Sequence, residues 1–287
     1  MTATAEVPTL PDGVGVYGGG RMGAGIAHAF LVSGSSVHVI ETSDESAAGA
    51  RDRIESSVAK AVERESLASD AAEVLGRLTV STDPARLAGR DLVVEAVPED
   101  VPLKRSVLAT IETVAPGSWI GTNTSSLSVD DLADGLASPD RLIGLHFFNP
   151  VPASDLVEIV VGAKTSAELG DLARSWVAGL GKTAITVTDS PGFASSRLGV
   201  AIALEAMRML EAGVASAADI DTAMTLGYKH PMGPLRTTDV VGLDVRLAIA
   251  EHLCRELGPR FEPPAILRDK VIQGELGRKT GRGFYQW

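Results

Sequence analysis

Residues 14–27 read VGVYGGGRMGAGIA, and this stretch predicts how the first half of the chain folds. Its apolar beginning, 14–17, is typical of a buried strand. The glycines that follow fit the pattern G-x-G-x-x-G, and an amphipathic pattern through Ile26, Phe30 and Leu31 then predicts a helix. A strand, a glycine turn and a helix in this order favour a dinucleotide-binding unit.

Each glycine of the pattern has a physical role in such a unit. Gly18 allows the tight turn out of the strand, Gly20 leaves the backbone open to a pyrophosphate, and Gly23 lets the helix pack closely on the strand. The N–H groups and the dipole of the helix start, where Arg21 and Met22 lie, hold the anion. We therefore predict that these five residues bind a cofactor. The alternative is a glycine-rich loop that only turns the chain.

A second expected strand, 36–40, supports the cofactor interpretation because it ends in Glu41. An acidic residue about 20 residues after the glycines accepts hydrogen bonds from a ribose 2′-hydroxyl. A carboxylate at this place also disfavours a 2′-phosphate. We therefore predict that the cofactor is NAD rather than NADP.

Composition excludes several classes of protein. The chain has 287 residues, of which 45% are hydrophobic, so it can bury the cores of two domains. Its formal net charge of -11 argues against nucleic acid as a partner. The single cysteine, Cys254, cannot form an internal disulfide and fits a reducing compartment. Without a signal sequence or an apolar run of about 20 residues, we expect a cytoplasmic protein that binds no membrane.

Strand-like and helical patterns alternate along the first two thirds of the chain. This alternation predicts an α/β fold with a doubly wound, mostly parallel sheet of the Rossmann type and helices on both faces. The expected strands are 14–17, 36–40, 78–80, 92–97, 119–120, 142–147, 156–161 and 184–187. After 189 we expect helices alone, at 193–211, 216–226, 243–257 and 264–273. We therefore predict a flexible tail (1–12), an NAD-binding domain (13–188) with a helical hairpin (44–67 and 70–76) and an all-α domain (189–287).

Two of the expected helices suggest contacts with other molecules. On the helix 44–67, the polar residues Arg53, Ser57, Lys60 and Arg64 recur at helical spacing and form one stripe, either a ligand-binding face or a solvated surface. The helix 193–211 is apolar almost all round and is expected to be buried on several sides. An all-α domain with such a helix would gain from a partner subunit, so we expect a homodimer.

His146 ends one expected strand, and Glu158 lies in the next. Strand ends in doubly wound folds face the ligand crevice. A histidine beside a carboxylate suits proton abstraction from an alcohol, because the carboxylate fixes the tautomer and stabilises the imidazolium. The alternative for His146 is a satisfied core histidine. The other four histidines show no metal-ligand spacing, so we expect no metal.

Several blocks together closely resemble the L-3-hydroxyacyl-CoA dehydrogenases, along nearly the whole chain. They are 18–27, 123–127 (NTSSL), 144–152 (GLHFFNPVP), 156–159 (LVEI), 191–193 (PGF), 231–234 (PMGP) and 279–285 (KTGRGFY). The resemblance implies oxidation of the 3-hydroxyl of an acyl-CoA to a ketone with hydride transfer to NAD. It also implies an N-terminal NAD-binding domain and a C-terminal helical domain that forms a homodimer.

The resemblance also implies roles for single residues. His146 would be the general base and Glu158 its partner, while Ser125 and Asn149 would fix the substrate oxygen and the nicotinamide end. The implied cofactor contacts are Glu99, Lys104 and Lys279, and the implied coenzyme A contacts are Ser57 and Arg64. The chain departs from the family in one place: its usual P-G-F-x-x-N-R reads PGFASSR at 191–197, which puts Ser196 in place of an active-site asparagine. This departure bears on the acyl group that the substrate carries.

Other functions remain open at this stage. A close variant would act on a 3-hydroxyacyl group carried by a protein-bound pantetheine. A second would oxidise a free 3-hydroxy acid, and a third would bind NAD without catalysis. The pairing of His146 with Glu158 argues against the last two, and the absence of a G-x-S-x-G motif argues against a hydrolase built on Ser125 and His146.

Overall fold

The computed structural model describes residues 8–287, which form two compact units with their boundary between Asp189 and Ser190. Residues 1–7 of the expected flexible tail lie outside the described residues. The rest of that tail packs against the first unit, because the Thr9 N–H donates to Ser175 Oγ at 2.8 Å and Leu10 joins the hydrophobic core. No helix among residues 8–287 is both long and apolar enough to cross a membrane.

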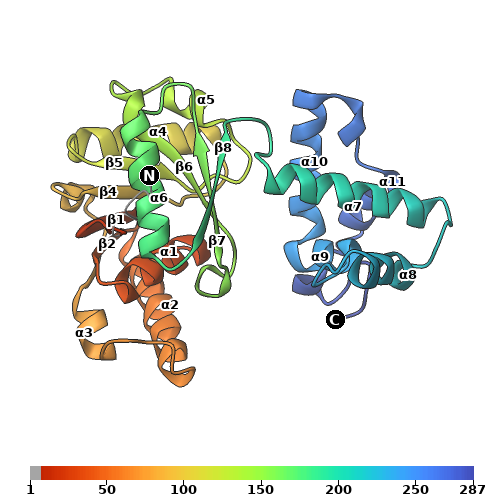
Figure 1. The fold of residues 1–287 in the computed structure, drawn as a ribbon, viewed down its shortest axis with the longest axis horizontal. Helices are drawn as coiled ribbons and strands as arrows, with labels where there is room; N and C mark the ends of the chain where they lie inside the picture. The colour runs from red at the N-terminus through yellow and green to blue at the C-terminus, as the bar shows by residue number, and fades with distance from the viewer. Residues whose placement is uncertain (1–7) are drawn as a thin grey trace, which may run out of the picture. The chain divides into compact units, whose positions relative to one another are not determined.

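The first unit is built on an eight-stranded sheet with the order β3-β2-β1-β4-β5-β6-β7-β8 (Figure 1). All neighbouring strands run parallel except β6 and β7, which are antiparallel. The strands are β1 (Gly13–Tyr17), β2 (Ser36–Ile40), β3 (Leu78–Ser81), β4 (Leu92–Glu95), β5 (Trp119–Thr122), β6 (Leu142–Phe147), β7 (Leu156–Val161) and β8 (Thr183–Thr188). The predicted α/β fold with a mostly parallel sheet is confirmed.

Burial explains why these segments form strands. Every residue of β4 and of β6 is buried, as expected for strands covered on both faces. Helices α1, α2 and α6 share one apolar core with the sheet, and α4 packs against β4. The helices of this unit are α1 (Arg21–Val32), α2 (Asp44–Glu63), α3 (Ala71–Gly76), α4 (Val101–Val114), α5 (Val129–Ala133) and α6 (Ala167–Gly179).

The second unit has a helical core, and each named strand of the described chain lies before it. Its helices are α7 (Ser195–Glu211), α8 (Ala217–Thr222), α9 (Pro234–Val241), α10 (Leu243–Leu257) and α11 (Ala265–Ile272). The expectation that the helix 193–211 is buried on several sides is wrong for the single chain. Leu198 on α7 is 62% exposed and Ile202 is 37% exposed, because only one face of α7 meets the core.

One helix ends earlier than expected, and another was not expected at all. The predicted helix 44–67 ends at Glu63, because Arg64 caps it and Glu65 takes the left-handed conformation with φ 54°. The helix α9 was not expected. Pro234 occupies its first turn, where backbone N–H groups have no partner within the helix, so the missing N–H of proline costs no hydrogen bond.

Candidate active site

The glycine turn between β1 and α1 has the geometry that a dinucleotide requires. Gly18 has φ 96°, a conformation that glycine adopts without strain. A β-carbon at Gly23 would overlap the carbonyl oxygen of Gly18, so only glycine permits this approach of helix to strand. A β-carbon at Gly20 would meet no atom within 4 Å, which leaves open space beside the backbone at the helix start. Of the two residues that follow Gly20, Arg21 is exposed and Met22 packs against the hydrophobic core.

Glu41 follows β2 and lies against this turn. Its Oε1 accepts a hydrogen bond from the Gly19 N–H at 2.6 Å. On the other side of the turn, Nη1 of Arg53 on α2 donates to the Gly19 carbonyl at 3.0 Å. The acidic residue that the sequence assigned to the ribose therefore lies at the glycine turn. The sequence did not predict that the backbone of Gly19 would hydrogen-bond with both Glu41 and Arg53.

His146 and Glu158 lie directly opposite each other on the antiparallel strands β6 and β7. The His146 Nδ1 is 2.9 Å from Glu158 Oε2, and both side chains are buried. If Glu158 is ionised, Nδ1 carries the proton and donates it, which leaves Nε2 free of a proton and able to accept one. The ring of Phe148 lies 4.5 Å from the His146 ring, centroid to centroid. The predicted pairing of these two residues is therefore present in the fold.

Ser125 lies in the loop that follows β5, the neighbour of β6, and this loop is held by Glu99. The Glu99 Oε1 accepts hydrogen bonds from Thr124 Oγ1 at 2.6 Å, the Ser125 N–H at 2.9 Å and the Ser126 N–H at 3.1 Å. Asn149 follows β6, so His146, Ser125 and Asn149 all lie near the carboxyl ends of two adjacent parallel strands. That edge is where doubly wound sheets bind their ligands.

Lys104 is 1% exposed and is surrounded by acceptors from its own chain. Its Nζ lies 2.7 Å from Glu95 Oε1, 3.2 Å from the Val97 carbonyl and 3.4 Å from Glu99 Oε2. Burial acts to raise the pKa of Glu99, but the Lys104 ammonium and the hydrogen bonds from Thr124 and the Ser125 backbone together lower that pKa below its ordinary value. The sequence singled out Glu99 and Lys104 but missed Glu95. A charged residue ending a strand of otherwise apolar residues was the available signal.

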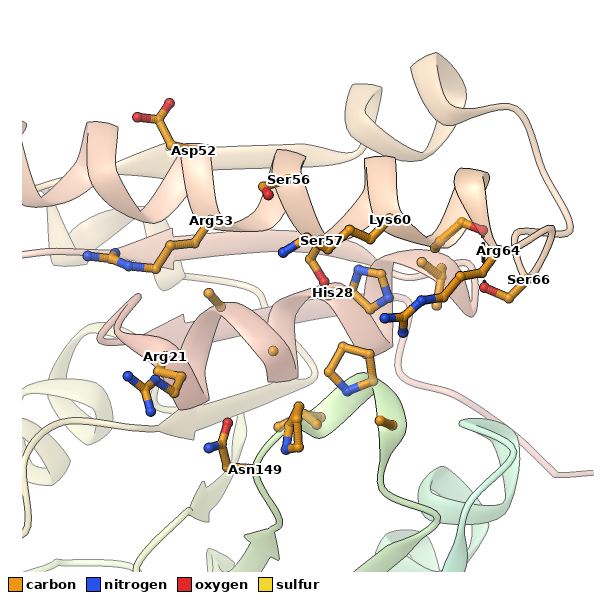
Figure 2. A pocket seen from close by; sticks show the side chains of 18 residues that line it. Arg21, His28, Asp52, Arg53, Ser56, Ser57, Lys60, Arg64, Ser66 and Asn149 are labelled. Carbon is orange, nitrogen blue, oxygen red and sulfur yellow. Dashed lines mark hydrogen bonds between the residues drawn. The ribbon is translucent and has the colours of Figure 1, made fainter. Parts of the chain in front are cut away.

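A cavity of about 840 Å³ lies between α1, α2 and the loop 149–153 (Figure 2). Its lining includes Ser57 and Arg64, the two residues that the resemblance assigned to coenzyme A, together with Lys60 and Arg53. The stripe predicted on α2 therefore faces a cavity. Four of the lining residues are basic and one is acidic (Arg21, Arg53, Lys60 and Arg64 against Asp52), so the cavity suits an anion although the whole chain is negative.

His28 on α1 also lines this cavity, and its ring lies near Ser57 and Arg64 in Figure 2. The ring is buried, and its Nδ1 has no hydrogen-bond partner within the described chain. Burial, with a smaller contribution from the Lys182 charge, lowers the pKa of His28 to about 4. His28 is therefore neutral at pH 7. Nothing in the sequence distinguished His28 from a purely structural histidine.

The remaining predicted residues lie in the second unit. Ser196 is in the first turn of α7. Lys279 lies in the short helical turn Arg278–Thr280, and its Nζ is 2.6 Å from each carboxylate oxygen of Asp244. The segment after Lys279 is anchored by Asp239, which accepts hydrogen bonds from the Phe284 and Tyr285 N–H groups and the Trp287 indole. Residues 8–287 contain no cluster of side chains that could hold a metal ion.

Two family models match the chain. Residues 13–190 match the 3-hydroxyacyl-CoA dehydrogenase, NAD binding domain, and residues 192–287 match the 3-hydroxyacyl-CoA dehydrogenase, C-terminal domain. Each model covers one of the two compact units almost entirely.

Individual proteins give the same result. The chain is 39% identical to a 3-hydroxybutyryl-CoA dehydrogenase of Mycobacterium tuberculosis, over 96% of this chain and 98% of that one. It is 37% identical to the mouse mitochondrial hydroxyacyl-coenzyme A dehydrogenase, over 96% and 90% of the two chains. The crystal structure of (S)-3-hydroxybutyryl-CoA dehydrogenase from Ralstonia eutropha is 39% identical and superposes with a TM-score of 0.92, covering 96% of this chain and 99% of that one.

Proposed function

This chain belongs to the 3-hydroxyacyl-CoA dehydrogenase family of NAD-dependent oxidoreductases, and we propose that it oxidises a short L-3-hydroxyacyl-CoA to the 3-oxoacyl-CoA. The observation that supports the proposal most is the buried pair of His146 and Glu158 at the ligand-binding edge of the sheet. The relatives named for 3-hydroxybutyryl-CoA support a short acyl chain.

In the proposed mechanism, the Nε2 atom of His146 removes the proton of the substrate hydroxyl. Glu158 holds the Nδ1 proton of the ring, fixes the tautomer and stabilises the imidazolium that forms. NAD held at the glycine turn and Glu41 would supply the acceptor for the hydride that leaves the third carbon of the substrate. We assign the substrate oxygen and the nicotinamide end to Ser125 and Asn149, which lie beyond the ends of β5 and β6.

The cofactor residues divide into binding and positioning groups. The open space at Gly20 and the carboxylate of Glu41 fit the pyrophosphate and the adenosine ribose of NAD. Glu99 is partly exposed and can reach a ligand, whereas Lys104 is buried. We therefore assign Lys104 to positioning Glu99 rather than to touching the cofactor. Lys279 remains a proposed cofactor contact by resemblance alone.

We place the coenzyme A phosphates in the cavity along α2. Its four basic side chains and the hydroxyl of Ser57 suit phosphate groups. Replacing Arg64 with glutamate should raise KM for the acyl-CoA about three- to tenfold, because it puts a negative charge beside phosphates at a solvated site. KM for NAD should not change. The matched variant Arg51→Glu, on the same helix but outside the cavity lining, should change neither KM value. Equal effects of the two variants would show that the stripe on α2 is a solvated surface and not a ligand-binding face.

The activity itself is tested with a panel of substrates. We would measure kcat/KM for 3-hydroxyacyl-CoAs of increasing length, for the same acyl groups on a carrier protein and for free 3-hydroxy acids. The proposal expects the coenzyme A esters to be the best substrates, with the L enantiomer preferred. Turnover of the free acids alone, or of no member of the panel, would overturn it.

A homodimer through the second unit and a cytoplasmic location complete the proposal. The exposed apolar side chains Leu198 and Ile202 on α7 support a partner surface on this helix. The single cysteine fits a reducing compartment. Analytical ultracentrifugation at micromolar concentration tests the dimer, and a monomer would refute it.

A further inference from the structure

Lys182 is a half-buried cation that directs its hydrogen bonds to one loop of the first unit. Its Nζ donates to the Val151 carbonyl at 2.8 Å and to the Ser154 carbonyl at 2.5 Å. Among residues 8–287 no carboxylate forms an ion pair with this ammonium. Burial lowers the pKa of Lys182, and the charge of Asp155 offsets only part of this effect. A half-buried ammonium needs acceptors to replace its lost hydration, and this loop supplies them.

The reversed direction of β7 explains why Lys182 lies at this loop. Strand β6 ends at Phe147, and both β7 and β8 run antiparallel to it, so they begin at the edge where β6 ends. Gly181 has φ 69°, which closes the end of α6 and turns the chain into Lys182, the residue before β8. A lysine at the start of β8 therefore lies at the ligand-binding edge of the sheet.

The loop 149–153 forms one wall of the cavity along α2. All five residues of the loop line this cavity, and Asn149 lies at its start, two residues after the end of β6 (Figure 2). The proposed function assigns Asn149 to the reacting end of the substrate and the cavity to coenzyme A. A shift of this loop would therefore move Asn149 and change the width of the cavity.

Contacts from two elements hold the loop in place. Val151 packs on α1 at Gly25, where an added β-carbon would lie 2.8 Å from the β-carbon of Val151. Lys182 binds the carbonyl of the same valine. Hydrogen bonds within 150–154 close a tight turn but join it to no other element. Lys182 therefore supplies a polar contact that ties this turn to the sheet.

We propose that Lys182 is a positioning residue of the substrate site, which holds the loop 149–153 so that Asn149 and the cavity wall are in place before the acyl-CoA binds. This inference rests on the proposed function and adds a residue to it. An ammonium suits the role because its three N–H donors can serve two carbonyls at once. Without Lys182 the ligand must order the loop itself, which weakens binding and misplaces the reacting end.

The first test measures binding without turnover. The dissociation constant of coenzyme A, measured by titration calorimetry, should rise about three- to tenfold in Lys182→Met, because ordering the loop now opposes binding. The dissociation constant of ADP-ribose, which uses the glycine turn and Glu41, should not change. The matched control Arg77→Met also removes a cation from a backbone carbonyl, that of Leu31 on α1, but lies outside the cavity lining and should change neither constant.

The second test follows the loop itself and the reaction. Peptides that cover 149–155 should exchange their amide hydrogens faster in Lys182→Met than in the wild type, while peptides of α2 keep their rates. Lys182→Arg retains a cation with several N–H donors and should restore much of the slow exchange and of the affinity for coenzyme A. In Lys182→Met, kcat/KM for the acyl-CoA should fall about 10- to 100-fold, the loss expected from a misplaced reacting group.

The outcomes separate this inference from the proposed function. If the wild type oxidises no thioester, the proposed function fails, and the binding and exchange measurements still decide the role of Lys182. If the wild type binds no coenzyme A, both fail. Unchanged exchange of the loop, or unchanged affinity for coenzyme A, in Lys182→Met would overturn the positioning role.

A purely structural role gives a different result. It would weaken the binding of coenzyme A and of ADP-ribose equally and lower the unfolding temperature, and this outcome would also overturn the inference. Should Lys182→Met not fold, Lys182→Gln, which keeps two N–H donors on a shorter side chain, takes its place in the same measurements.

Discussion

Lys104 and Arg246 are both buried cations, but the protein surrounds them differently. Lys104 in the first unit is 1% exposed and meets Glu95, Glu99 and a backbone carbonyl within 3.4 Å. Arg246 in the second unit is 8% exposed and has no carboxylate partner within the described chain. The fold thus supplies acidic partners for Lys104 and none for Arg246.

The difference separates a cation that positions its neighbours from a cation that the fold leaves without an acidic partner. A cation whose partners all belong to the chain fixes those partners in place, and Lys104 does so for Glu99, which in turn holds the loop of Ser125. A buried cation without such partners, such as Arg246, instead lowers the stability of the folded chain. The same distinction can be applied to the other buried polar groups of the molecule.

The largest expected effect on activity comes from the buried pair of His146 and Glu158. His146→Ala should lower kcat by about 10²–10⁴, the range for loss of a general base, because it removes the proposed acceptor of the hydroxyl proton. KM for NAD should stay nearly the same. Glu158→Gln should also lower kcat while far-ultraviolet circular dichroism shows an intact fold. Near-normal turnover in His146→Ala would remove this pair from the mechanism.

The second prediction tests the paired cation, Lys104, directly. Lys104→Met should lower the free energy of unfolding by about 3–5 kcal/mol, because it leaves Glu95 buried and charged without its partner. The matched control is Lys164→Met, which breaks the exposed pair with Asp134 and should lower the free energy of unfolding far less than Lys104→Met does. Urea unfolding measures both. Adding Glu95→Gln to Lys104→Met should recover part of the loss, and no recovery would show that the pair itself is not the cause.

His28 is a buried titratable side chain of the first unit, and unlike Lys104 it is not fully paired, because its Nδ1 has no hydrogen-bond partner in the described chain. Its pKa is about 4 in the folded protein and 6.5 as the reference value, so the unfolded chain binds more protons between these values. Stability is therefore complete above pH 6.5 and falls as the pH drops toward 4, by up to about 3 kcal/mol.

His28→Gln should remove this dependence on pH, measured by urea unfolding from pH 4 to pH 8. His252→Gln, a histidine on α10, serves as the control and should retain the contribution of His28. A slope that survives in His28→Gln would show that the imidazole tolerates its charge in the fold, and would weaken the contrast between paired and unpaired groups.

The smallest expected effect concerns Glu41, a carboxylate that is only partly satisfied by the Gly19 N–H. The enzyme should prefer NAD to NADP at least tenfold in kcat/KM, which corresponds to about 1.4 kcal/mol, because Glu41 repels a 2′-phosphate. Glu41→Ser should narrow the ratio, and Glu45→Ser, at the exposed start of α2, should leave it unchanged. Equal use of the two cofactors by the wild type would remove Glu41 from cofactor selection.

The sequence predicted the parts of the fold that depend on local pattern. Continuous apolar runs identified the buried strands, including β2, β6 and β7 with their observed bounds, and glycine spacing identified the turn at Gly18. The C-terminal end of α2 was missed because Glu65 adopts a left-handed conformation without a glycine to signal it. Helix α9 was missed because its start, the PMGP block, was taken only as a motif.

The site was predictable where a motif marked a residue and not where a partner was distant in sequence. His146, Glu158 and Glu41 stood out by position and type. Glu95 as a partner of Lys104, and Arg53 as a partner of Gly19, become visible only when strand order and helix packing bring them together. Arg246 carried no sequence signal at all, because its significance is the lack of a partner in the fold.

The antiparallel pairing of β6 with β7 has a consequence for folding specificity. The four central residues of β7, 157–160, are buried, so the strand lacks the alternation of polar and apolar residues that usually fixes register. A slip by one residue would still bury apolar side chains on both faces. It would, however, turn the carboxylate of Glu158 away from His146 and into an apolar layer, where it would lack a partner. The contact assigned to proton transfer therefore also favours the observed register of β7 against β6.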